Sequence, residues 1–239
     1  MSIVAVIQAR MSSQRLPRKV LTPIAGRPLL EHLLLRLDRS RSIEQRVLAT
    51  SVDPSDDELA DWATRRGETV VRGPLDDVLE RFVMAIHLTS ARTVIRVTGD
   101  NPLTSAESID RTVSALAERG GDYAAETGLP VGAAAEVVRA SALTRSARHT
   151  EEIRHREHVT LYIRENPDVF QILTMPAPAT VRRPHYRLTV DEPADLELMQ
   201  LVFRHLGTGA PPPLEVVIAF LDANPGVAAL NNGVSQFVP

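Results

Sequence analysis

Short runs of β-branched and other apolar residues alternate along the first half of the chain with longer segments whose apolar positions recur three and four residues apart. The short runs predict buried strands, and the longer segments predict helices that cover a sheet with one face. The predicted strands are 3–9, 46–51, 69–72 and 93–98, and the predicted helices are 29–39, 55–66 and 76–88. This alternation is typical of an α/β fold with a mostly parallel sheet between helices.

Local signals place two helix starts. Ser55 with Glu58 and Thr104 with Glu107 have the capping-box spacing, in which the two side chains satisfy free N–H groups of a first turn. We therefore expect Ser55 and Thr104 to begin helices.

The alternation weakens after about residue 120, where Gly120 and Gly121 are followed by loops and by the proline-rich segment 175–184. We expect a single domain over 1–239, in which 120–185 is a small inserted α+β region between the first half, 1–119, and a return to the regular pattern, 186–239. The expected elements of that last part are a strand at 186–190, a helix at 193–206 and, beyond the prolines at 211–213, a short terminal helix.

Composition excludes several classes of function. Of the 239 residues, 44% are hydrophobic and the formal net charge is −3, which is ordinary for a globular protein and argues against a general nucleic-acid-binding surface. The chain has no cysteine, so disulfides, thiolate metal ligands and thiol nucleophiles are absent. The first apolar run lacks the features of a secretory signal, and no stretch has the length of a membrane span. We expect a cytoplasmic protein without a membrane or nucleic-acid partner.

Four cations follow the first predicted strand directly. Arg10, Arg15, Arg18 and Lys19 belong to a polar loop that also carries the small residues Ser12 and Ser13. Ligands of open parallel α/β sheets bind at the carboxyl ends of the strands, and so many cations there indicate a polyphosphate. The loop lacks the glycine spacing of a Walker motif. A solvated basic surface loop is the simpler alternative.

Two aspartates follow predicted strands. Asp100 comes directly after 93–98 and faces the same crevice as the basic loop, where a divalent cation such as Mg²⁺ would relieve its repulsion of phosphate. Asp191 comes after 186–190, and it adds a second carboxylate to the same ion if the two strands are neighbours. The alternatives are a turn residue for Asp100 and a helix cap for Asp191.

Several segments are familiar when they are taken together. They are 7–21, 25–32, 48–51, 71–78, 98–103, 156–160 and 189–193. In this order they resemble the cytidylyltransferase superfamily of the CMP-KDO and CMP-sialate synthetases, and within it the branch of spore coat polysaccharide biosynthesis protein F. The resemblance implies a Rossmann-like, three-layer fold of the nucleotide-diphospho-sugar transferase (GT-A-like) type. It also implies that the protein binds CTP and Mg²⁺, that an acceptor oxygen attacks the α-phosphorus, and that pyrophosphate is released.

The resemblance carries specific roles over to this chain. It implies that Arg10, Arg15, Lys19 and Asp100 are catalytic and that Asp100 and Asp191 bind the metal. Arg72 and Asp77 fall where related enzymes hold the base and the ribose. The full nucleotide-binding set is then Gln8, Ala9, Arg10, Ser12, Ser13, Arg15, Lys19, Arg72, Gly73, Asp77 and Asp100. The candidates for binding an anionic acceptor are Glu136, Arg156, His158 and Arg187.

Three positions depart from the family pattern. Ser12 and Arg18 stand where glycine is usual, and Ala134 replaces an aspartate in the segment before Glu136. The change at residue 18 bears on how the loop closes, and the change at residue 134 bears on acceptor binding.

We expect a Mg²⁺-dependent cytidylyltransferase that transfers CMP to an acidic sugar or related anionic acceptor, in polysaccharide, glycan or specialised-metabolite biosynthesis. One alternative is a glycosyltransferase of the same fold, although Gly99-Asp100-Asn101-Pro102 lacks the second acid of an Asp-x-Asp motif. Another is a catalytically silent nucleotide-binding protein. Relatives often dimerise through the inserted region, so a homodimer through 120–185 is expected.

Overall fold

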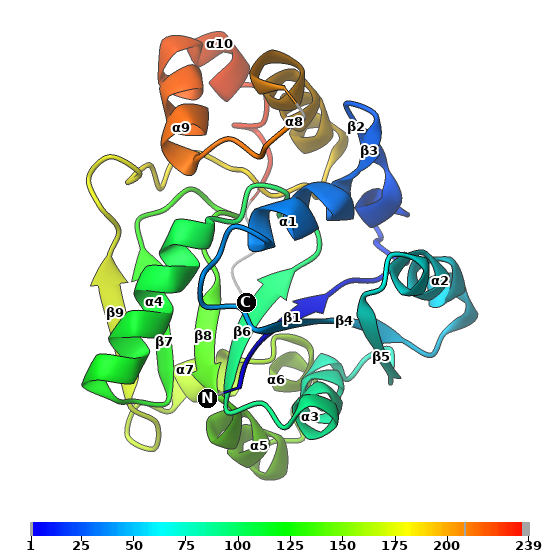
Figure 1. Ribbon diagram of the computed structural model, residues 1–239, viewed down its shortest axis with the longest axis vertical. Helices are drawn as coiled ribbons and strands as arrows, with labels where there is room; N and C mark the ends of the chain where they lie inside the picture. The colour runs from blue at the N-terminus through cyan, green and yellow to red at the C-terminus, as the bar shows by residue number, and fades with distance from the viewer. Residues whose placement is uncertain (1, 208, 236–239) are drawn as a thin grey trace.

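The computed structural model describes residues 2–207 and 209–235, and it is built on a seven-stranded sheet with the strand order β5-β4-β1-β6-β8-β7-β9 (Figure 1). Only β8 runs antiparallel to its neighbours. The strands of this sheet are β1 (Ile3–Gln8), β4 (Gln45–Ser51), β5 (Thr69–Gly73), β6 (Thr93–Thr98), β7 (Tyr123–Thr127), β8 (Glu136–Arg139) and β9 (Ile172–Pro176). A separate hairpin pairs β2 (Pro23–Ile24) with β3 (Arg27–Pro28).

Helices cover both faces of the sheet, which gives three layers. The helices in the described residues are α1 (Leu29–Leu37), α2 (Asp57–Arg65), α3 (Val78–Thr89), α4 (Ala106–Arg119), α5 (Ala140–His149), α6 (Ile153–Glu157), α7 (Leu161–Glu165), α8 (Pro193–Leu206), α9 (Leu214–Ala223) and α10 (Pro225–Ala228). Buried side chains of α1, α2 and α4 pack on one face, and those of α3, α5 and α7 pack on the other. Alternate residues of each central strand enter the two cores, as the two-residue period of a strand requires. The expected three-layer α/β fold is confirmed.

The register of the central strands brings the expected site residues together. Gln8 at the end of β1 lies opposite Thr98 at the end of β6, so the basic loop begins beside Asp100. The N–H of Gly99 donates to the carbonyl oxygen of Gln8 at 2.8 Å, and a Cβ on Gly99 would lie 2.7 Å from that of Ala9. Glycine is therefore required where the two loops leave the sheet.

Both predicted capping boxes are wrong. Residues Pro54–Asp56 form a 3-10 turn that Asp53 caps by accepting a hydrogen bond from the N–H of Ser55, and α2 begins only at Asp57. Helix α4 is capped by Ser105, whose side chain accepts from the N–H of Ser108. The spacing is present in both places, but a proline-started turn and a neighbouring serine satisfy the first-turn N–H groups instead.

Residues 120–185 add β7, β8 and β9 to the same sheet. The strand predicted at 186–190 is wrong, because a single bridge between Val131 and Arg187 replaces it. This segment pairs with two different loops, since Leu188 donates to the carbonyl oxygen of Val131 at 2.7 Å and Val190 donates to that of Asp100 at 3.0 Å. No continuous ladder forms when the partners come from separate loops.

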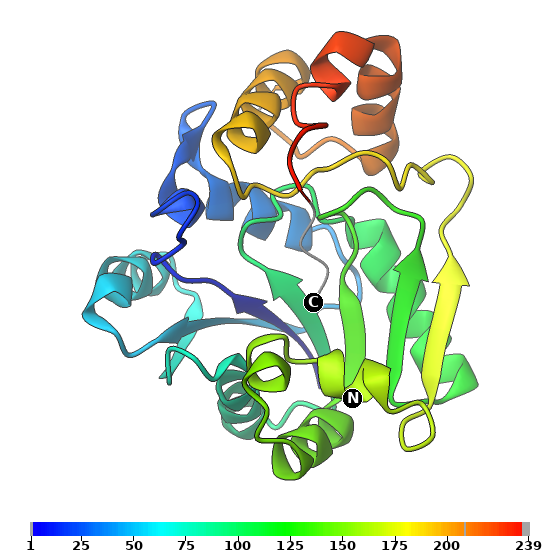
Figure 2. The same cartoon turned by 180° about the vertical axis from the view of Figure 1, so that it is seen from behind.

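Helix α8 spans 193–206 as predicted, with Pro193 in its first turn and a capping box of Glu192 and Asp195. The expected terminal helix is α9, which α10 follows. Figures 1 and 2 show α8, α9 and α10 together at one end of the molecule, beyond the tips of β7 and β9. Buried side chains of α8 and α9 form a third core with Ile24 and Leu29, and residues of α10 pack against it. This core fastens the segment before α8 to the rest of the fold.

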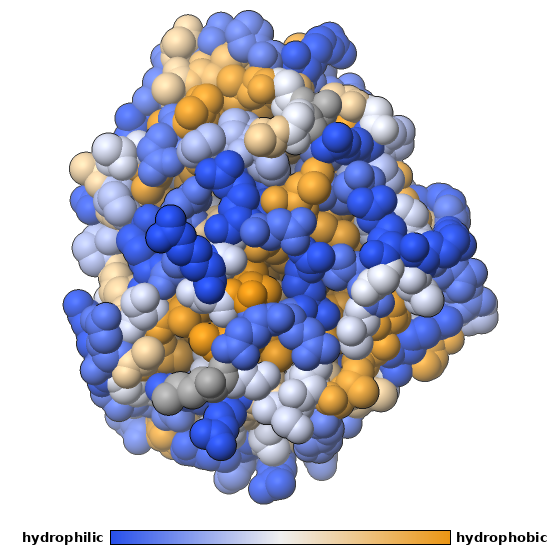
Figure 3. Space-filling model, viewed as in Figure 1, coloured by the Kyte–Doolittle hydropathy of each residue, from blue (hydrophilic) through white to orange (hydrophobic). Residues whose placement is uncertain are grey.

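The face seen in Figure 3 is largely hydrophilic, and hydrophobic residues reach it in separate areas, some of them over the C-terminal helices. Among the residues that the structure describes, no helix is long and apolar enough to cross a membrane.

Candidate active site

A cleft of about 490 Å³ opens at the carboxyl ends of β1 and β6. Its lining includes nine of the residues expected to bind ligand or metal: Gln8, Ala9, Arg10, Ser13, Arg15, Lys19, Asp100, His158 and Asp191. Those expected residues that do not line it are Ser12, Arg72, Gly73, Asp77, Glu136, Arg156 and Arg187. The structure thus brings together the basic loop and both aspartates, which are far apart in the sequence.

Lys19 lies between the two aspartates. Its Nζ is 2.6 Å from Oδ2 of Asp100 and 2.7 Å from Oδ1 of Asp191. Burial opposes the charge of the Lys19 ammonium, but the two carboxylates outweigh burial and raise its pKa. Burial likewise works against the charge of Asp191, and Lys19, Arg15 and Arg187 together lower the pKa of that carboxyl. Both partners are therefore charged at neutral pH.

A buried carboxylate holds the Asp191 loop in place. Asp195 is 0% exposed and accepts hydrogen bonds from the N–H groups of Asp191 and Glu192 at 2.9 and 3.0 Å. Arg187 joins the two aspartates, with its Nε 2.9 Å from Asp195 and its Nη2 2.5 Å from Asp191. Arg187 therefore positions Asp191. Its side chain is largely buried and does not line the cleft, where an acceptor contact was expected for it.

The remaining loop cations differ in where they point. Arg15 lies 3.3 Å from both Asp191 and Glu192, and Arg10 lies 3.7 Å from Glu157; both side chains line the cleft and are about two-fifths exposed. Arg18 instead forms an ion pair with Glu58 on the outside. Its φ of 62° is in the left-handed region, which explains why glycine suits this position.

The basic loop has a buried anchor that the sequence pattern did not reveal. Asp56 is 0% exposed, and its Oδ1 accepts a hydrogen bond from the N–H of Met11 at 2.7 Å. The other end of the loop closes through the N–H of Arg18, which donates to the carbonyl oxygen of Met11 at 2.9 Å. These bonds pre-form the loop from which Ser13 and Arg15 reach the cleft.

The donors at the centre of the cleft fit Mg²⁺. Two carboxylates converge on one cationic atom, the Lys19 ammonium, and Mg²⁺ is commonly held by one or two carboxylates together with substrate phosphates. Over residues 2–207 and 209–235, no group of three or more His, Asp or Glu side chains is placed to hold a metal. Asp100 and Asp191 would thus hold the ion jointly with a nucleotide.

Two residues expected at the base and ribose are engaged elsewhere. Arg72 donates to the carbonyl oxygens of Ser51 and Asp53 at 2.8 and 3.1 Å, and it pairs with Asp57 at 2.6 Å. Asp77 caps α3 through the N–H of Glu80 and forms an ion pair with Arg156. Asp77 and Arg156 border a neighbouring hollow of about 450 Å³ that shares Arg10 and Glu157 with the cleft.

Glu136 lies in an internal network rather than on the cleft surface. Its carboxylate accepts from the hydroxyls of Tyr123 at 2.6 Å and Thr160 at 3.0 Å, and it pairs with Arg96 at 2.5 Å. Burial disfavours the charge of Glu136, but Arg96 and the other donors prevail and lower its pKa. Nε of Arg96 also donates to Oε1 of Gln8 at 3.0 Å, so the network orients a residue of the cleft.

His158, one of the residues expected to bind the acceptor, lines the cleft beside Glu157. The next residue, Val159, has a φ of 49°, and β-branched residues rarely adopt this left-handed conformation. Burial is the main cause that lowers the pKa of His158, followed by nearby arginines, so the ring is neutral at neutral pH. The cleft is also lined by Arg81 and Val78 of α3; the signal for Arg81 was an arginine among apolar positions of a predicted helix.

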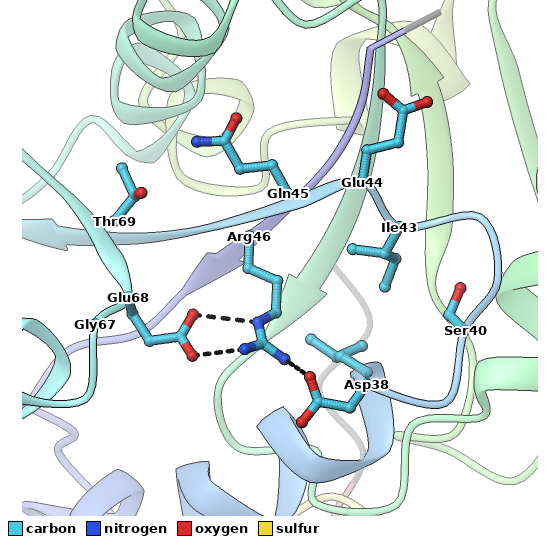
Figure 4. A pocket seen from close by; sticks show the side chains of 10 residues that line it. Asp38, Ser40, Ile43, Glu44, Gln45, Arg46, Gly67, Glu68 and Thr69 are labelled. Atoms are coloured by element: carbon cyan, nitrogen blue, oxygen red, sulfur yellow. Dashed lines mark hydrogen bonds and ion pairs between the residues drawn. The ribbon is translucent and has the colours of Figure 1, made fainter.

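A second hollow, of about 340 Å³, lies at the amino ends of β4 and β5 (Figure 4). Arg46 points into it, but Glu68 and Asp38 neutralise its guanidinium, with Nε and Nη2 of Arg46 at 3.1 and 2.8 Å from Glu68. Because parallel α/β sheets bind ligands at the carboxyl ends of their strands, the cleft at β1 and β6 is the candidate active site.

Comparisons with known proteins agree with this fold. Residues 4–205 match the family model described as "Cytidylyltransferase". The chain is 36% identical over 231 residues to spore coat polysaccharide biosynthesis protein SpsF of Bacillus subtilis, which covers 95% of this chain and 96% of that protein. A cytidylyltransferase structure from Leptospira borgpetersenii superposes with a TM-score of 0.89 at 26% identity, over 100% of this chain and 99% of the other.

A structure of CMP-2-keto-3-deoxy-manno-octonic acid synthetase in complex with CTP has the same fold, with a TM-score of 0.67 at 16% identity over 86% of this chain and all of the other. The family model covers most of the chain, and within that span lie the basic loop, Asp100 and Asp191. The chain therefore belongs to the cytidylyltransferase family.

Proposed function

We propose that this protein transfers CMP from CTP to an anionic small molecule, such as an acidic sugar, and releases pyrophosphate. The observation that carries the proposal is that Asp100 and Asp191 converge on the ammonium of Lys19, in the cleft that Arg10 and Arg15 also line. Membership of the cytidylyltransferase family and the CTP complex of a relative of the same fold support CTP as the donor.

The reaction asks for positioning and charge neutralisation. An acceptor oxygen attacks the α-phosphorus of CTP, a new P–O bond forms, and the bond from the α-phosphorus to the bridging oxygen breaks. The electron pair of that bond leaves with pyrophosphate. If the attacking oxygen belongs to an ionised carboxylate or phosphate of the acceptor, it carries no proton at neutral pH and the step needs no general base.

Residues of the loop would neutralise the charge that develops. Arg10, Arg15 and Lys19 can donate hydrogen bonds to phosphate oxygens, and such preorganised donors act most strongly on charge that grows in the transition state. The raised pKa of Lys19 keeps its ammonium charged for this role. Mg²⁺ held by Asp100 and Asp191 would neutralise phosphate oxygens and make the α-phosphorus more electrophilic.

The acceptor would enter beside His158 and Glu157, which line the cleft next to Arg10 of the basic loop. An anionic acceptor suits the cations nearby, because Arg10 reaches this side and the Arg156 side chain borders the adjoining hollow.

The test is pyrophosphate release with Mg²⁺, using CTP, UTP, GTP and ATP against a panel of acidic sugars and sugar phosphates. We expect acceptor-dependent release that favours CTP and falls by about 100-fold or more in Asp100→Ala, since loss of a metal ligand removes several kcal/mol of transition-state stabilisation. Asp222→Ala, which removes an exposed partner of Arg183, should retain the wild-type rate. Tight CTP binding without release for any acceptor would instead support a silent nucleotide-binding protein.

A further inference from the structure

The amide of Asn231 joins the C-terminal segment to the loop that carries Asp191. Asn231 is 2% exposed, and its Nδ2 donates to the carbonyl oxygen of Arg187 at 3.0 Å and to Oδ1 of Asp195 at 2.8 Å. A side-chain amide has two N–H donors, so both are used here. Asn231 lies beyond residues 4–205, which match the family model. A residue outside the family model thus contacts the two groups that hold Asp191.

The turn after α10 carries Asn231 to this place. Val227 and Ala228 of α10 pack against the third core. The N–H of Leu230 donates to the carbonyl oxygen of Val227 at 3.2 Å, and the N–H of Val234 donates to that of Asn231 at 3.0 Å. Figure 2 shows the chain after α10 turning back beside the segment that precedes α8. The packing of the C-terminal helices therefore determines where the Asn231 amide lies.

Asp195 connects Asn231 to Asp191. Its Oδ1 accepts hydrogen bonds from Asn231 and from Nε of Arg187, and its Oδ2 accepts them from the N–H groups of Asp191 and Glu192. A fully buried carboxylate depends on such donors, because water cannot replace them. Without the Asn231 amide, Oδ1 of Asp195 and the carbonyl oxygen of Arg187 each lose a donor. Both groups can then shift, and the Asp191 loop shifts with them.

The two oxygens of Asp191 have different partners. Oδ2 is 2.5 Å from Nη2 of Arg187, whereas Oδ1 is 2.7 Å from Nζ of Lys19 and 3.3 Å from Nη2 of Arg15. Lys19 and Arg15 line the cleft, and Arg187 does not. Arg187 thus holds one oxygen from behind and leaves the other directed toward the cleft. Because Mg²⁺ demands nearly ideal octahedral geometry, its binding is sensitive to the direction of this oxygen.

We propose that Asn231 is a positioning residue of the active site. It holds Arg187 and Asp195 in the places from which they direct Oδ1 of Asp191 into the cleft. Asn231 does not itself line the cleft, so it acts through Asp191 and not on a ligand. The C-terminal helices therefore support the site although their side chains stay outside it. The inference rests on the proposed function, because it takes Asp191 as a ligand of Mg²⁺.

The test compares Asn231→Leu with Asn224→Leu, which removes a donor to the carbonyl oxygen of Phe220 at 2.8 Å within the same C-terminal helices. Calorimetry measures CTP binding with Mg²⁺ and with EDTA. In Asn231→Leu, binding with Mg²⁺ should weaken by about 10-fold, as is usual when a partner that orients a metal ligand is lost, and binding with EDTA should stay the same. Hydrogen exchange over 186–196, followed by mass spectrometry, should become faster. Asn224→Leu should change neither measurement.

Melting temperatures should fall in both variants, since each loses a hydrogen bond, so stability alone does not distinguish them. Asn231→Ser keeps one donor and should give intermediate values. It also provides the same measurements if Asn231→Leu does not fold.

A double-mutant cycle shows whether Asn231 acts through Asp191. In an Asp191→Ala background, Asn231→Leu should weaken CTP binding with Mg²⁺ no further, because the carboxylate that it positions is absent. Additive losses would overturn the inference, and so would wild-type Mg²⁺-dependent binding or wild-type exchange over 186–196 in folded Asn231→Leu. A wild type that binds no CTP would refute the proposed function, whereas the exchange measurement would still decide whether Asn231 orders the Asp191 loop.

Discussion

The N–H of Val190 donates a hydrogen bond to the carbonyl oxygen of Asp100 over 3.0 Å. This bond joins two segments that are ninety positions apart in the sequence, and it places Asp191 beside Asp100. Lys19 can then lie within hydrogen-bond distance of both carboxylates. The centre of the cleft thus depends on backbone contacts between loops as much as on the three side chains.

Gly132→Ala should damage the site from a distance. Gly132 has a φ of 86°, and a Cβ there would lie 2.6 Å from the backbone nitrogen of Thr189, two residues before Asp191. An alanine in the left-handed conformation costs about 1–2 kcal/mol, and we expect the free energy of unfolding to fall by more than this because of the added clash. We also expect pyrophosphate release to be lost. Urea unfolding and the release assay measure the two effects. The matched control is Gly67→Ala, since Gly67 has a φ of 79° but open space around its Cβ position. Equal effects of the two substitutions would contradict the proposed steric coupling to Asp191.

Lys19→Met should increase the affinity of the nucleotide-free protein for Mg²⁺. The Lys19 ammonium neutralises Asp100 and Asp191, so its removal leaves two carboxylates that repel one another and attract a divalent cation. We expect the melting temperature of the variant to be lower than that of the wild type without Mg²⁺ and to rise more when Mg²⁺ is added. Lys19→Arg retains the positive charge and should respond to Mg²⁺ less than Lys19→Met does. If the two variants and the wild type respond equally, the aspartates do not hold the ion.

Glu136→Ala should destabilise the fold, because it leaves the Arg96 guanidinium partly buried without its carboxylate. Loss of one partner of a buried ion pair costs about 3 kcal/mol, and urea unfolding measures this change. Arg96→Met combined with Glu136→Leu removes both charges and should regain much of the stability. A variant Glu136→Ala of wild-type stability with a raised KM for the acceptor would instead favour the acceptor-binding role that the sequence suggested.

The free energy of unfolding should decrease as the pH is lowered from 8 to 5. Burial is the main cause that lowers the pKa of His32 and of His158 from the ordinary value of 6.5. The unfolded chain therefore binds protons in this range that the folded chain does not, and the free energy of unfolding decreases as the pH falls. Urea midpoints measured across this range should show the decline. His32→Gln retains a donor for the carbonyl oxygen of Ile24, which Nε2 of His32 contacts at 2.8 Å, and should flatten the dependence. An unchanged slope in this variant would refute the assignment to His32.

Sequence patterns predicted the elements whose signals are local. The first four strands of the main sheet and the helix at 193–206 were confirmed. They could be predicted because buried side chains recur every two residues in a strand and about every 3.6 residues in a helix, which neighbouring residues of the sequence show directly. The basic loop and Asp100 were recognisable for a similar reason, since each follows directly on a strand end. The capping boxes and the strand at 186–190 were wrong, because competing hydrogen bonds from Asp53, Ser105 and the Val131 loop decided those segments.

By itself, then, the sequence determined the α/β class, the covering helices and the charged residues available to a nucleotide site. Tertiary structure decided which of those residues meet. It placed Lys19 between Asp100 and Asp191, and it turned Arg72 away from the cleft. It also left Nε and Nη1 of the buried Arg81 side chain without a hydrogen-bond partner among the described residues. The physical reason is that strand register and loop-to-loop hydrogen bonds fix distances between residues far apart in the chain, and no local pattern of side chains encodes those distances.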